Sequence, residues 1–233
     1  MLAAAAVCPH PPLLVPELAG AASAELDGLR AACDLVVGSL IESRPDVLVV
    51  VGGAGSTASH PPDSAGSFAP YGVDVRVGEG EPTLPLSLTA GRWLLDRAGY
   101  PGRLALEAVA FDAPAEDCLR LGRDLAASAG RVALLVMGDG SACLTEKSPG
   151  YLDPAARPYQ EMLVRALERA DADALAGLDP GEADRLLVAG RAAWQVLAGA
   201  AGGRGCRGGL HYAAAPYGVG YVVAEWVPEP AGR

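Results

Sequence analysis

The sequence predicts a single α/β domain with a mostly parallel central sheet flanked by helices. Apolar runs at residues 2–7, 46–51 and 131–137 have the length and composition of strands buried on both faces. Between the first two, residues 19–43 repeat apolar side chains every three or four positions, as one face of a buried helix does. A strand, a helix and a second strand in this order form a right-handed unit with parallel strands. With 233 residues, 51% of them apolar, the chain can bury one large core.

The remaining elements follow from the same patterns, taken along the chain. Further strands are expected at residues 73–77 and 104–111, and two closing strands at residues 210–215 and 218–226. Helices are expected at residues 83–98, 115–129, 154–170, 171–178 and 180–201. The domain should therefore cover residues 1–228, and residues 229–233 should form a loose C-terminal tail.

Charge and cysteine content narrow the classes of function. The net charge of −10 argues against nucleic acid and anionic membrane surfaces as partners. The five cysteines form no CxxC pair, so zinc-ribbon and thioredoxin-like sites are not expected. No stretch reaches the roughly 20 apolar residues that a membrane span needs, and residues 2–7 have no charged segment before them, as a signal peptide would. We therefore expect a cytoplasmic protein.

A proline-rich loop follows the first strand and carries a histidine. Pro9 and Pro11 fix their own backbone angles and hold the residue between them, His10, in an extended conformation. Loops at the carboxyl ends of strands are where open α/β sheets bind ligands. His10 is therefore a candidate site residue, although a proline-rich turn with an incidental histidine explains the same pattern.

Two more strand ends carry groups that could line a site. Residues 52–56 are a glycine-rich turn, which predicts either a weak phosphate site or the start of a long irregular loop. After the strand at residues 131–137, Asp139 and Ser141 would bring a carboxylate and a hydroxyl to the same edge of the sheet as His10. The alternative for both side chains is a turn in which they bond nearby backbone N–H groups.

Three of these segments together resemble a known family. The loop Cys-Pro-His-Pro-Pro-Leu-Leu-Val-Pro-Glu at residues 8–17 resembles the N-terminal metal-ligand loop in the catalytic subunit of class III extradiol ring-cleavage dioxygenases. The ending Ala-Ala-Pro-Tyr-Gly-Val-Gly-Tyr at residues 214–221 resembles the closing strands of that superfamily, especially of its Memo-like branch. Gly138 and Asp139 stand where the family has a Gly-Asp segment, and the resemblance covers nearly the whole chain.

The resemblance implies a specific chemistry and shows where this chain departs from it. Active members hold Fe(II) with two histidines and one glutamate, bind a catechol and O₂, and use another histidine as acid and base. His10 matches the first ligand. Residues 53–55 stand at the second ligand, and no carboxylate stands near Arg191, the place of the glutamate. Residues 141–143, the place of the acid/base histidine, contain none.

The favoured hypothesis is a divergent member of this superfamily that lacks the standard Fe(II) site. It would bind a small aromatic or other small-molecule ligand, or a partner protein, in a pocket lined by His10, Ser56, Asp139 and Ser141. A homodimer is compatible with the resemblance.

Two alternatives remain open. The chain could be an active non-haem Fe(II) dioxygenase that cleaves a catechol-type ring, with a rearranged site for Fe(II) or another divalent metal. His10 and His60 would then be metal ligands, joined by Asp139 or Glu146. In the second alternative the chain is a metal-free enzyme in which a cysteine on one of the site loops, at position 8 or 143, is the nucleophile.

Overall fold

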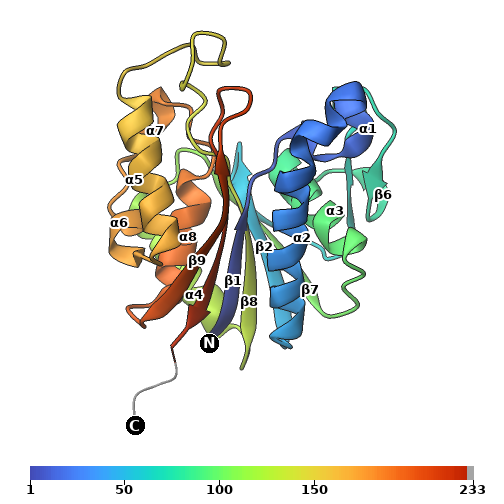
Figure 1. Ribbon diagram of the computed structural model, residues 1–233. Helices are drawn as coiled ribbons and strands as arrows, with labels where there is room; N and C mark the ends of the chain where they lie inside the picture. The colour runs from blue at the N-terminus through green and yellow to red at the C-terminus, as the bar shows by residue number, and fades with distance from the viewer. Residues whose placement is uncertain (230–233) are drawn as a thin grey trace.

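The central sheet has a parallel core with antiparallel strands at its ends. The computed structural model describes residues 1–229, and within them one sheet has seven strands in the order β3-β7-β2-β8-β1-β10-β9 (Figure 1). The parallel strands are β1 (Leu2–Cys8), β2 (Val47–Ala54), β7 (Leu104–Ala110) and β8 (Val132–Met137). Antiparallel to their neighbours are β3 (Ala58–His60), β9 (Cys206–Ala214) and β10 (Tyr221–Pro228).

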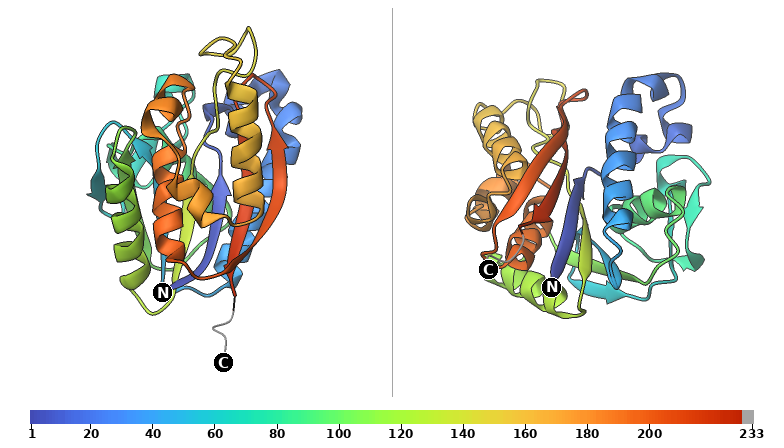
Figure 2. Two further views of the ribbon diagram at one scale, coloured as in Figure 1. Left: turned by 90° about the vertical axis from the view of Figure 1, so that its left-hand side faces the viewer. Right: turned by 60° about the horizontal axis from the view of Figure 1, so that its bottom comes forward.

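Helices cover both faces of this sheet, as Figures 1 and 2 show. One face carries α1 (Pro16–Ala19), α2 (Asp27–Glu42) and α3 (Leu86–Arg97). The other carries α4 (Ala115–Ala127), α5 (Ala156–Glu168), α6 (Ala172–Ala176), α7 (Pro180–Arg185) and α8 (Arg191–Ala201). Successive strand residues alternate between two cores: Val49 lies in the core shared with α8, and Val50 lies in the core shared with α2. This arrangement confirms the predicted fold class.

The four parallel strands end at one edge of the sheet, here named the carboxyl edge. β1 starts at the N-terminus at the bottom of Figure 1, so the carboxyl edge is uppermost in that view. The ends of neighbouring strands lie in register, with Met137 of β8 beside both Cys8 of β1 and Gly52 of β2. The loop that follows β8 and the turn between β9 and β10 project above this edge. The segments predicted to carry a site are therefore neighbours in space.

Several predicted elements differ from the structure; the helix expected from residue 19, for example, becomes regular only at Asp27, the start of α2. The helix expected over residues 180–201 is two helices, α7 and α8, separated by a turn in which Leu187 has a φ of +51°. The glycine-rich segment at residues 52–54 continues β2 and is not a turn, because the missing Cβ of Gly52 leaves room for Ser87, only 2.5 Å from where that atom would lie. Farther along, a small sheet combines β4 (Ser64–Ser67), β5 (Arg76–Val77) and β6 (Glu79–Pro82).

The C-terminal tail is expected to begin at Glu229, the last described residue, and residues 230–233 of it lie outside the described residues. No helix within residues 1–229 combines the length and the apolar composition required to cross a membrane.

Candidate ligand-binding site at the carboxyl edge

His10 and Asp139 meet at the carboxyl edge, at the ends of the adjacent strands β1 and β8. The backbone N–H of His10 donates a hydrogen bond to Asp139 Oδ1 at 2.8 Å. The ring atom Nδ1 of His10 lies 3.8 Å from the same oxygen, which is too far for a hydrogen bond. His10 is 5% exposed, and its Nδ1 has no hydrogen-bond partner among the described residues. The structure thus brings His10 and Asp139 together and leaves one ring nitrogen of His10 without a partner.

A tyrosine and the β9–β10 turn enclose this pair. Burial, together with the nearby carboxylate of Asp139, raises the pKa of Tyr221, so its phenol keeps its proton at neutral pH. The turn is attached to the loop after β8, because the N–H of Gly140 donates to the carbonyl of Gly220 at 2.7 Å. Farther out, the Tyr217 hydroxyl donates to Glu25 Oε2 at 3.0 Å. His10 and Asp139 therefore sit in a hydrogen-bonded frame with one phenol donor beside the carboxylate.

Ser141, another predicted site residue, is part of the packing and does not face a cavity. Its side chain is fully buried. The hydroxyl donates to the carbonyl of Leu186 at 2.9 Å and accepts the N–H of Cys143 at 3.1 Å. These two bonds tie the loop after β8 to the turn between α7 and α8. The expected catalytic role of Ser141 is thus corrected to a structural one, which is the turn that the sequence left open as an alternative.

The two cysteines considered as nucleophiles are also buried. Burial and the neighbouring Cys33 thiol raise the pKa of Cys8 well above its ordinary value. Burial likewise raises the pKa of the Cys143 thiol, which is 2% exposed. Reactive cysteines need thiolate character and access to solvent. The structure provides neither at these two positions.

His60, the predicted second metal ligand, lies far from His10. It ends β3, where it pairs with Leu106 of β7. Three strands, β7, β2 and β8, separate β3 from β1, and at about 4.8 Å for each strand spacing the separation is roughly 19 Å. The expected grouping of these two histidines with Asp139 or Glu146 is therefore corrected, because the segment after β2 pairs along the sheet and does not fold over it. Within residues 1–229, no group of three or more His, Cys, Asp or Glu side chains is placed to hold a metal ion.

A phenylalanine fills the place where the resemblance implies a second histidine ligand. At Gly53 of β2, an added Cβ would lie 2.4 Å from a ring carbon of Phe111 and 2.8 Å from the carbonyl oxygen of Ala189. Real Cβ atoms almost never come so close to another atom, so no larger side chain fits without displacing both segments. The glycine here is required by close packing between β2, the segment after β7 and the turn before α8.

A buried arginine stands where the resemblance implies the glutamate ligand. Arg191, the first residue of α8, is 1% exposed. Its Nη1 donates to Ala113 O at 2.6 Å and to Gln195 Oε1 at 2.9 Å, and its Nη2 donates to Phe111 O. Arg191 thereby fixes the segment that holds Phe111 over Gly53. A guanidinium repels a divalent cation, so the residues at this edge do not fit the Fe(II) site that the resemblance implies.

Phe111 and Trp194 are residues of this region that the sequence patterns did not single out as functional. The indole of Trp194 packs over Gly190, and its Nε1 lies 3.0 Å from where a Cβ of Gly138 would be. The signal that could have located them is the set of glycines after strands and before α8, since each one marks a place where a large side chain comes close to the backbone.

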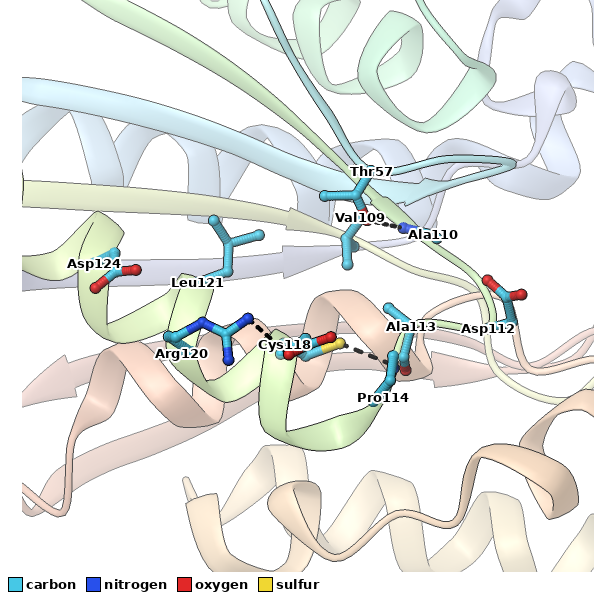
Figure 3. A pocket seen from close by; sticks show the side chains of 11 residues that line it. Thr57, Val109, Ala110, Asp112, Ala113, Pro114, Cys118, Arg120, Leu121 and Asp124 are labelled. Atoms are coloured by element: carbon cyan, nitrogen blue, oxygen red, sulfur yellow. Dashed lines mark hydrogen bonds and ion pairs between the residues drawn. The ribbon is translucent and has the colours of Figure 1, made fainter.

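Of the cavities on the same face as α8, two border the end of β7 or the segment that follows it. The larger, of about 650 Å³, runs between α4 and the end of β7, with Val109 and Leu121 in its walls and three aspartates, Asp112, Asp117 and Asp124, lining it (Figure 3). The smaller, of about 250 Å³, is lined by Phe111, Ala183, Asp184, Leu187, Val188 and Ala189. The smaller cavity belongs to the carboxyl edge, because Phe111 and Ala189 are the residues that pack over Gly53.

Comparison with known proteins gives a likeness of fold. No protein-family model matches the chain, and no curated protein matches it. Among solved structures, the chain is similar to the crystal structure of the uncharacterized protein JW3007 from Escherichia coli K12, with a TM-score of 0.56 and 15% sequence identity. That similarity covers 97% of this chain and 99% of the other. At this identity the match supports the α/β fold of the whole chain and carries no statement about activity.

Proposed function

We propose that this chain is a divergent relative of the class III extradiol dioxygenases that binds a small organic molecule at the carboxyl edge without Fe(II). The observation that carries the proposal is Arg191. Its buried guanidinium stands at the implied glutamate position and holds Phe111 over the implied histidine position. At the two positions where the resemblance implies metal ligands, this chain thus has the guanidinium of Arg191 and the ring of Phe111.

The groups left at this edge suit hydrogen-bonded recognition of a small molecule. Asp139 offers an acceptor beside the protonated phenol of Tyr221, and His10 offers a ring nitrogen without a partner. Buried polar atoms without partners are rare in native proteins, and a bound ligand is one way to satisfy them. The ligand expected here is a small ring compound that carries at least one polar group, because these three residues offer polar atoms and the smaller cavity at the same edge has mainly apolar walls.

The metal part of the proposal is tested by iron content. After anaerobic loading with Fe(II) and removal of free metal, mass spectrometry should find only trace iron in the wild type and in His10→Ala alike. A single histidine does not retain the metal, and Arg191 opposes it. The matched control is His211→Ala, on β9. Near-stoichiometric iron that is lost in His10→Ala but kept in His211→Ala would establish the alternative, an Fe(II) dioxygenase with rearranged ligands.

The ligand part is tested on the imidazole signals themselves. The chain has three histidines, so ¹⁵N spectra of the imidazole rings contain few signals, which single substitutions can assign. During titration with small aromatic compounds, the His10 signals should move while those of His60 and His211 stay fixed. If none of the compounds that bind the protein moves the His10 signals, His10 does not belong to a ligand site.

A further inference from the structure

We propose that the smaller cavity, here named the Phe111 cavity, binds an aromatic amine: one ring with a short cationic arm. The inference rests on the proposed function in one respect, namely that the chain binds a small organic molecule at the carboxyl edge. It adds a second binding place at that edge and the class of ligand that this place takes. The walls of the Phe111 cavity come from the segment after β7 and from the turn between α7 and α8, so they are separate from His10 and Asp139.

The size and the lining of the Phe111 cavity favour a ligand that has a single ring. Its volume of about 250 Å³ lies below the roughly 300–1,000 Å³ typical of sites for drug-sized ligands. Five of its six lining residues are apolar: Phe111, Ala183, Leu187, Val188 and Ala189. An aromatic ring can pack against the ring of Phe111, and such ring pairs gain stability beyond the burial of their area.

Exposed apolar side chains gather around this cavity. Phe111 is 49% exposed and Leu187 is 47% exposed, although both have apolar neighbours. The adjoining loop contributes Tyr151 and Leu152, at 75% and 53% exposure, and an added Cβ on Gly150 would lie 2.7 Å from Leu187 Cδ1. Exposed apolar patches of this kind typically mark a surface that binds something.

The backbone holds two of these side chains in an unusual conformation. Leu187 has a φ of +51° and Tyr151 a φ of +58°, in the left-handed region that bulky residues rarely adopt. Hydrogen bonds from Leu187 N to Asp184 O at 3.0 Å and from Tyr151 N to Ser148 O at 2.9 Å accompany these conformations. Strained residues of this kind concentrate at functional sites. Strain and exposure therefore occur together at Leu187, which lines the cavity, and at Tyr151 in the adjoining loop.

The charge around the Phe111 cavity favours a ligand with a positive charge. Asp184 is its one ionisable lining residue and makes no ion pair among the described residues. The next residue, Arg185, is engaged by Asp153 and Glu182. Arg191 lies behind Phe111, where three oxygen atoms accept its hydrogen bonds. With a net charge of −10 on the chain, an ammonium group is attracted here and a carboxylate is repelled.

The test is a titration of the 233-residue protein with 2-phenylethylamine, in which calorimetry measures the heat of binding. We expect saturable binding of the amine, weaker binding of neutral 2-phenylethanol, and none of anionic 3-phenylpropionate. Asp184→Asn should weaken amine binding about tenfold, whereas Asp173→Asn, an exposed aspartate on α6 outside the cavity, should not. Leu187→Gly removes one wall at a position whose φ suits glycine, so it should fold and should weaken both the amine and the alcohol.

Each contrary outcome overturns the inference. Equal binding of the anion rejects the charge class, and an unchanged affinity in Asp184→Asn or in Leu187→Gly rejects the place. No saturable amine binding rejects the ligand class. These results are distinguishable from failure of the proposed function, which is measured separately by iron content and by the His10 imidazole signals.

Discussion

Replacing Trp194 by alanine is expected to lower the free energy of unfolding by about 3–5 kcal/mol, more than any other substitution proposed for this chain. Trp194 is fully buried on α8. Its ring fills the space left by two glycines, lying 2.4 Å from where a Cβ of Gly190 would be and 3.0 Å from that of Gly138. Truncation therefore opens a cavity between α8 and the end of β8, lined by backbone that cannot collapse into it. Urea unfolding followed by circular dichroism measures the loss.

The matched control, Trp194→Phe, keeps one aromatic ring and removes the indole N–H. Nε1 of Trp194 has no hydrogen-bond partner among the described residues, so Trp194→Phe sacrifices volume but no hydrogen bond. We expect a cost below about 1.5 kcal/mol. If the phenylalanine variant lost as much stability as the alanine variant, the indole N–H would be making a bond that this packing does not contain.

Replacing Arg191 by methionine should cost about 2–4 kcal/mol. The unbranched methionine retains most of the volume but leaves Phe111 O and Ala113 O without their donor. Part of that loss is offset, because a buried guanidinium is itself expensive to desolvate. Arg191→Lys should fall between the wild type and Arg191→Met, since an ammonium cannot reach acceptors on both sides as a planar guanidinium does.

Two measurements separate this prediction from a general loss of stability. Arg157→Met, at an exposed arginine on α5, should change stability by no more than about 0.5 kcal/mol. Hydrogen exchange in Arg191→Met should accelerate at residues 111–113 more than in β1 or β8, because Arg191 holds that segment in place. If Arg191→Met were more stable than the wild type, burial of the guanidinium would destabilise the protein by more than its three hydrogen bonds to oxygen stabilise it.

Much of the fold was predictable because its signals are local. The run of apolar, mostly β-branched residues at positions 47–51 indicates a buried strand, and the structure has β2 there. The helices predicted from residues 115 and 154 agree with α4 and α5 to within a few residues. The turn at Leu187 escaped prediction because a leucine with a positive φ violates the local preference, and only the surrounding packing sustains it.

For the candidate site too, local patterns predicted some features, and others depended on the tertiary structure. Local patterns were enough to show that His10 leaves β1 in a stiff proline loop and that Asp139 follows another buried strand, because proline geometry and strand periodicity act within a few residues. Long-range packing was needed to show that His60 lies on the far edge strand, that Ser141 is used in packing, and that Arg191 is buried at an implied ligand position. Sheet order, burial and hydrogen-bond partners depend on residues distant in the chain, and no local pattern contains them.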